Sequence, residues 1–216
     1  MAHSHRYTIG GIEFDRTELR DLAAAWVALA VACTFFLSPQ YVRQQPFVMD
    51  ETVLNELGSL FILSMLTVGT AFLLHELAHK VVAIQFGQVA AFRADYGFLF
   101  IAIISGLAGF LFAAPGAVYH RGRITDRQHG LIAVAGPVTN IGLAALFFVP
   151  FMLFAGFIQE VAQMGVIINL FLAAFNMIPF GPLDGKTVIN WHKGVFALVL
   201  VTAVGAGAAF LLTFGF

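Results

Sequence analysis

Charged residues are scarce in this chain of 216 residues. Only 11% of them are Asp, Glu, Lys or Arg, and 60% are hydrophobic, whereas soluble domains average about 25% charged and about 45–50% apolar residues. The mean hydropathy is +0.89. This composition excludes a soluble globular domain and is typical of a polytopic membrane protein whose surroundings are a lipid bilayer.

An excess of basic charge is also missing. The chain has 11 Lys and Arg against 12 Asp and Glu, so its net charge is −1. Because nucleic-acid binders carry a basic footprint, we expect no nucleic-acid partner. The single cysteine, Cys33, excludes a disulfide within the chain.

Long apolar runs dominate the sequence, and each is about as long as a membrane-crossing helix. The runs cover residues 22–38, 57–74, 97–115, 131–158, 161–178 and 194–216. We therefore expect an α-helical polytopic membrane protein with about five to six transmembrane helices, formed as a single domain over residues 1–216. The first run gives an N-terminal helix and the last a C-terminal helix. Residues 7–14 (YTIGGIEF) are expected to form a short strand.

The second run leads without a break into His75-Glu76-Leu77-Ala78-His79. Histidines at positions i and i+4 lie on one face of a helix, so both imidazoles can reach one cation. In this pattern zinc takes the two imidazoles, and the glutamate acts on bound water. The alternative is a plain helix end, in which Glu76 would be an unpaired carboxylate beside lipid.

A catalytic zinc ion needs a third protein ligand and one open position. Asp184 is the candidate, because it follows a stretch with two prolines, Pro179 and Pro182, that ends the fifth run. Non-helical backbone at membrane depth is tolerated only where it lines a cavity or is buried in protein. The alternative is a loop aspartate that ends the span and pairs with Lys186.

Three motifs in this order, each on its own apolar run, resemble the site-2 protease family of intramembrane zinc metalloproteases. They are HELAH at 75–79, Ala135-Gly136-Pro137-x-x-Asn140, and Asn176-x-x-Pro179-x-x-Pro182-Leu183-Asp184-Gly185. The resemblance covers residues 57–190, which would form the catalytic core. The chain resembles a minimal form of the family, without a PDZ or CBS domain.

The resemblance implies one Zn²⁺ per chain, held by His75, His79 and Asp184, with Glu76 activating water. It also implies that Asn140 positions the substrate or stabilises the tetrahedral intermediate. The alternative for Asn140 is a hydrogen bond between packed spans. Gly136 is expected to set helix packing rather than chemistry.

The distribution of Lys and Arg tests how the runs cross the membrane. If the third run does not cross, ten of these residues fall on one side and only Arg43 falls on the other. The ten are Arg6, Arg16, Arg20, Lys80, Arg93, Arg121, Arg123, Arg127, Lys186 and Lys193. If it crosses, the split is five to six. The positive-inside rule therefore favours a non-crossing third run and a cytoplasmic N-terminus.

The proposed zinc site leads independently to the same topology. With a non-crossing third run, the histidine pair and Asp184 lie at the same membrane face; with a crossing run, about 30 Å of hydrocarbon separates them. We therefore expect residues 97–115 to form a re-entrant or β-hairpin segment. Residues 98–104 are rich in strand formers, and their exposed edge could pair with an unwound substrate.

These observations predict a zinc-dependent intramembrane endopeptidase that cleaves transmembrane protein substrates in regulated intramembrane proteolysis. We expect a multi-pass protein of the cell membrane, with its active site toward the cytoplasm. The sequence leaves the oligomeric state open. Two alternatives remain: a metal transporter, which would need ligands near the midplane and related halves, and a non-catalytic membrane scaffold without metal.

Overall fold

The computed structural model describes residues 6–39, 50–111 and 115–215. Within these residues, five helices are long and apolar enough to cross a membrane, which confirms the α-helical polytopic class. They span Arg16–Leu37, Glu51–Gln85, Asp126–Leu153, Phe157–Asn176 and Lys193–Phe214. The 35-residue second span is built from α3 (Glu51–Ser64), the π-helical turn η1 (Met65–Gly69) and α4 (Thr70–Gln85).

The chain divides into two compact units, each described by itself below. The first takes in the described residues up to Thr70 and those from Ala91 to Ala117. The second takes in Ala71–Ala90 and Val118–Phe216. All three predicted metal ligands belong to the second unit.

The first unit begins with a hairpin of β1 (Arg6–Ile9) and β2 (Ile12–Asp15), which pair antiparallel with Tyr7 opposite Phe14. The strand expected at residues 7–14 is thus two short strands joined by a turn at Gly10 and Gly11. Both glycines have positive φ, a conformation that favours glycine. Asp15 then caps α1 (Arg16–Leu37) by accepting a hydrogen bond from the Glu18 backbone N–H.

The third apolar run is helical at residues 98–104, so the strand expected there is wrong. These residues belong to α5 (Tyr96–Leu107), which packs on α1. Asp95 caps α5, and within lipid a helix satisfies its own backbone groups, which outweighs strand propensity. The strands lie on either side instead, as the two-stranded sheet of β3 (Val89–Ala94) and β4 (Gly116–Arg121).

The length of α5 agrees with a third run that does not cross. Its 12 residues extend about 18 Å, less than the roughly 30 Å of bilayer hydrocarbon. No strand edge exists at residues 98–104, so the pairing of that edge with a substrate is withdrawn.

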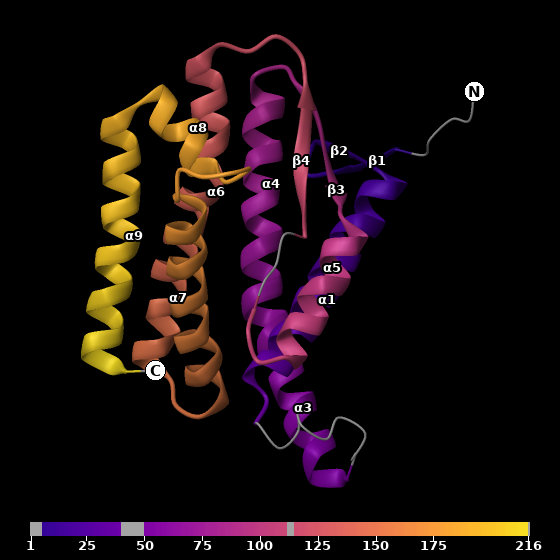
Figure 1. Ribbon diagram of the computed structural model, residues 1–216, viewed down its shortest axis with the longest axis vertical. Coiled ribbons are helices and arrows are strands. Elements are labelled where there is room, and N and C mark those ends of the chain that lie inside the picture. Colours follow the sequence, from indigo (N-terminus) through magenta and orange to yellow (C-terminus); the bar gives the residue numbers. More distant parts are fainter. Residues whose placement is uncertain (1–5, 40–49, 112–114, 216) are drawn as a thin grey trace. The chain divides into compact units, whose positions relative to one another are not determined.

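The second unit contains the C-terminal half of the second span and four further helices. These are α6 (Asp126–Leu153), α7 (Phe157–Asn176), α8 (Asp184–Trp191) and α9 (Lys193–Phe214). Helix α7 packs on both α6 and α9, and the short α8 contacts α6 and α9 (Figure 1). The helix break lies at residues 154–156, where Gly156 takes a positive φ. It therefore falls inside the fourth apolar run, and not at residues 159–160 between the fourth and fifth runs, which belong to α7.

Apolar clusters hold these helices together. One joins α6, α7 and α9 through Phe151, Val166 and Phe210. Another joins α6 and α8 to α9 around the fully buried Met177 and Val188. Asp184, the first residue of α8, is therefore carried on a helix with its own buried packing.

Candidate metal centre

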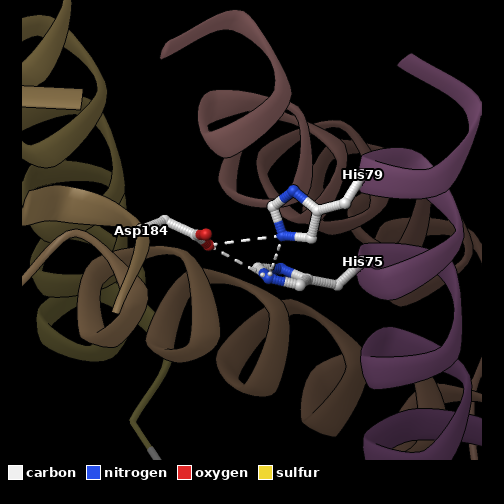
Figure 2. Close-up of side chains that lie close together, drawn as sticks. All are labelled: His75, His79 and Asp184. Carbon is white, nitrogen blue, oxygen red and sulfur yellow. Dashed lines mark hydrogen bonds and ion pairs between the residues drawn. The ribbon is translucent and has the colours of Figure 1, made fainter. Parts of the chain in front are cut away.

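Helix α4 presents both histidines of the HELAH motif on one buried face, as the i, i+4 spacing predicts. The Nε2 atoms of His75 and His79 lie 3.0 Å apart. Figure 2 shows both imidazoles pointing away from α4 toward the carboxylate of Asp184. Asp184 Oδ2 lies 3.3 Å from His75 Nε2 and 3.4 Å from His79 Nε2.

A tight turn delivers Asp184 to this position. Helix α7 ends at Asn176, and Gly181 turns the chain with a φ of +60° before α8 begins at Asp184. A Cβ atom on Gly185 would collide with the backbone of Met177, so only glycine allows α8 to start this close to the end of α7. The Pro- and Gly-rich stretch therefore aims the carboxylate at the two imidazoles.

The other nitrogen of each imidazole faces an oxygen on α6. His75 Nδ1 lies 2.6 Å from Asn140 Oδ1, and His79 Nδ1 lies 2.7 Å from the carbonyl oxygen of Ile132. Both oxygens act as acceptors here, so each Nδ1 carries the hydrogen and donates it. The Nε2 atom of each neutral imidazole is then left with a bare lone pair.

Three electron-pair donors thus converge on one point with no hydrogen between them. Asp184 Oδ2 is buried and has no hydrogen-bond partner. A proton on one Nε2 atom could satisfy only part of this cluster, whereas a tetrahedral divalent cation satisfies all three donors and keeps a fourth position. The ligating atoms lie within 4.8 Å of one another, and no other such group is found among the described residues.

The charge of Asp184 suits a metal ligand. Burial raises the pKa of its carboxyl, and positive charge at the two facing imidazoles, His79 and His75, would lower this pKa to about 2. A divalent cation held between the three donors places positive charge at the same point, so Asp184 binds it as an anion.

Gly136 creates the space that the imidazoles occupy against α6. A Cβ atom at this position would lie 2.5 Å from His75 Nε2 and from His79 Nε2. The close approach of the α6 backbone to α4 therefore requires glycine, which agrees with the packing role expected for Gly136.

Glu76 follows His75 on α4 and is buried. Its carboxylate accepts a hydrogen bond from the backbone N–H of Val118 in β4. It lies close enough to interact electrostatically with His79, His75 and Asp184. The structure thus brings together all four residues of the predicted centre: the three ligands and the glutamate.

Asn140 is fully buried, and all of its polar atoms are engaged within the protein. Its Oδ1 faces His75, and its Nδ2 donates to the Ala71 carbonyl at 3.2 Å and to Asn169 Oδ1 at 2.8 Å. The contact between Asn140 and His75 was not foreseen from the sequence. Asn169 was missed entirely, although an amide within an apolar run is the signal that could have identified it.

The fold and the site define an α-helical membrane protein with a two-histidine, one-carboxylate metal centre. A protein of Methanocaldococcus jannaschii that carries the provisional name zinc metalloprotease is 41% identical over 149 residues, 67% of this chain and 78% of the relative. A Bacillus subtilis protein with the same provisional name is 32% identical over 145 residues, 58% of this chain and 66% of the relative.

The chain belongs to this family of zinc metalloproteases. Its cofactor is zinc, and the buried, convergent donor set described above fits this ion. No family model and no solved structure matches the chain.

Proposed function

We propose that this protein is an intramembrane endopeptidase of the site-2 protease type, which hydrolyses peptide bonds of transmembrane protein substrates. The observation that carries the proposal is the position of the metal centre. Two of its ligands lie on α4, inside an apolar helix long enough to cross the membrane. In a water-soluble protease the metal ligands do not need to lie on a helix of this length and apolar composition.

The proposed ligands are His75, His79 and Asp184. Zinc held by them supplies a Lewis acid, which polarises a scissile carbonyl and makes water a nucleophile near neutral pH. The Nδ1 bonds to Asn140 and Ile132 keep both imidazoles in the tautomer that offers Nε2.

Glu76 is the proposed general base. Its carboxylate takes the proton of the attacking water and passes it to the leaving amide nitrogen, so that the C–N bond breaks to give a carboxylate and an amine. The Val118 N–H bond holds one side of this carboxylate. Burial beside the ligands keeps it within reach of the reacting atoms.

The substrate is proposed to be a membrane helix that unwinds locally. Within a helix each carbonyl is engaged in the hydrogen bond from residue i+4, so cleavage needs an extended stretch. His79 lies six residues before the end of α4, about 9 Å along the helix axis. A short path for water from one membrane face is consistent with that position.

The proposed location is the cell membrane, with the active site toward the cytoplasm and a role in regulated intramembrane proteolysis. The ten-to-one division of Lys and Arg supports this orientation. The short α5, which does not extend across the hydrocarbon, supports the crossing pattern on which that division rests.

Asn140 is proposed to position His75 rather than to contact the substrate. Its oxygen and both amide hydrogens already have partners inside the protein. A role in stabilising the tetrahedral intermediate would require it to leave these bonds.

The test compares the full chain with Glu76→Gln in detergent or vesicles. The variant should keep one zinc per chain, and its cleavage of a reporter transmembrane helix should fall at least about 100-fold, because the general base is gone. Glu160→Gln, which alters an exposed glutamate on α7, serves as the matched control and should cleave normally. Full cleavage by Glu76→Gln would rule out this assignment.

A further inference from the structure

Asn169 is a fully buried amide in the middle of α7, outside the ligand set. Its Nδ2 donates to the Gly165 carbonyl at 2.8 Å, and its Oδ1 accepts from Asn140 Nδ2 at 2.8 Å. A buried amide in an apolar helix is costly unless its hydrogen bonds are made. Asn169 makes them, and one leads toward the metal centre.

The direction of every bond in this chain of contacts is fixed by chemistry. A backbone carbonyl can only accept, so the Gly165 oxygen fixes Nδ2 of Asn169 toward itself and Oδ1 toward Asn140. Asn140 must then turn its own Nδ2 toward Asn169, and a second carbonyl, that of Ala71, requires the same orientation.

The fixed orientation of the Asn140 amide determines how the ligand His75 forms its hydrogen bond. With its Nδ2 toward Asn169, Asn140 turns Oδ1 toward His75, and His75 must donate from Nδ1. Only the Nε2 lone pair then remains for the metal. A run of donors and acceptors thus extends from the backbone of α7 through two amides to the ligating nitrogen.

We propose that Asn169 is a positioning residue of the zinc centre, which acts through Asn140 to hold His75 in its metal-binding tautomer and orientation. This inference rests on the zinc ligands assigned under the proposed function. Residues behind metal-bound histidines tune ligand orientation and basicity, and their loss typically weakens metal binding about 10–100-fold.

The two histidines differ in how they are held. His79 donates directly to the Ile132 backbone carbonyl, which no side-chain substitution removes. The orientation of His75 depends instead on two side chains, directly on Asn140 and, through Asn140, on Asn169. Substitution of Asn169 should therefore disturb only the His75 side of the centre.

The experiment measures zinc affinity and the visible absorption of bound Co²⁺ for the full chain in detergent. Asn169→Leu removes both amide bonds at similar volume and should weaken zinc binding about tenfold, at the lower end of the range because Ala71 still holds Asn140. Asn169→Asp keeps an oxygen that accepts from Asn140 and should restore most of the affinity. Leu170→Ala, a buried neighbour on the same helix, controls for lost packing and should bind zinc normally.

A double substitution separates positioning from general stability. If Asn169 acts through Asn140, the pair Asn140→Leu and Asn169→Leu should bind zinc no more weakly than Asn140→Leu alone. Additive losses would overturn the inference, as would an affinity of Asn169→Leu within twofold of the unsubstituted chain. Equal losses in Asn169→Leu and Leu170→Ala would also overturn it.

The same measurements distinguish failure of this inference from failure of the proposed function. If the unsubstituted chain shows no tetrahedral Co²⁺ spectrum that His75→Ala abolishes, the zinc centre itself is wrongly assigned. If that spectrum is present and Asn169→Leu leaves it and the zinc affinity unchanged, only the role of Asn169 is rejected.

Discussion

Gly136 on α6 faces the ring of His75 so closely that a Cβ atom would lie 2.5 Å from the Cε1 and Nε2 atoms of that ring. The same atom would lie 2.5 Å from His79 Nε2. The absence of a side chain at one position on α6 therefore defines the space in which both ligating nitrogens sit.

Gly136→Ala should displace the imidazoles and lower the zinc content of the purified protein, because neither ring can move away without losing its Nδ1 bond. Metal analysis by mass spectrometry measures this directly. Gly142→Ala is the matched control on the same helix, since nothing lies within 4 Å of a Cβ atom there. Equal zinc content in the two variants would contradict the packing role of Gly136.

Removal of zinc should destabilise the fold, because it leaves three converging electron-pair donors without a cation. At a free zinc concentration 100 times Kd, the ion contributes about 2.7 kcal/mol to the free energy of unfolding. A chelator should therefore lower Tm, and added zinc should restore it. The shift should disappear in His79→Ala and persist in His129→Ala, which alters a histidine outside the centre; persistence in both would place zinc elsewhere.

Asp15 combines two roles that substitution can separate. One carboxylate oxygen caps α1 through the Glu18 N–H, and the other accepts from Arg93 Nη2 at 2.6 Å. Asn caps helices as well as Asp does, so Asp15→Asn should lose only the ion pair, whereas Asp15→Ala should cost about 1 kcal/mol more in the free energy of unfolding. Thermal unfolding of the three proteins gives the comparison, and equal losses would mean that the cap contributes nothing.

The stability of the protein should also depend on pH through Asp15. Burial opposes ionisation, but the bonds from Arg93 and Glu18 outweigh it and hold the pKa of Asp15 below its ordinary 3.8. A carboxyl whose pKa is lower in the folded state stabilises the fold above its unfolded pKa and loses this effect as the pH falls through the folded value. Below pH 3.8, Tm should therefore fall more steeply for the unsubstituted chain than for Asp15→Asn.

The metal centre was largely predictable because its determinants are local in the sequence. The i, i+4 spacing alone places His75 and His79 on one helix face, and the prolines before Asp184 signal a break in the fifth run. The long apolar runs likewise predicted the spans, because bilayer thickness sets helix length.

The parts that were missed depend on long-range contacts or on the solvent. The side chains of residues 98–104 favour a strand, but the segment forms a helix. In a bilayer a helix is favoured because all of its backbone hydrogen bonds are made within the segment. Asn169 lies 94 positions after His75 in the sequence, and no local sequence pattern connects the two residues. Only the packing of α7 against α6 brings its amide into contact with Asn140.

Helix α6 supports both histidines of α4 from two points, the Ile132 carbonyl and the Asn140 amide, which are separated by eight positions or about 12 Å along the axis. The separation of these two acceptors along α6 therefore has to suit the positions of His79 and His75 on α4. Inserting or deleting one residue between Ile132 and Asn140 would rotate one acceptor by about 100° about the helix axis relative to the other. Apart from changes at Gly136, point changes in this stretch can be absorbed locally, but a change in its length cannot. Among related chains we therefore expect the other positions of this interval to vary in composition, and the interval not to vary in length.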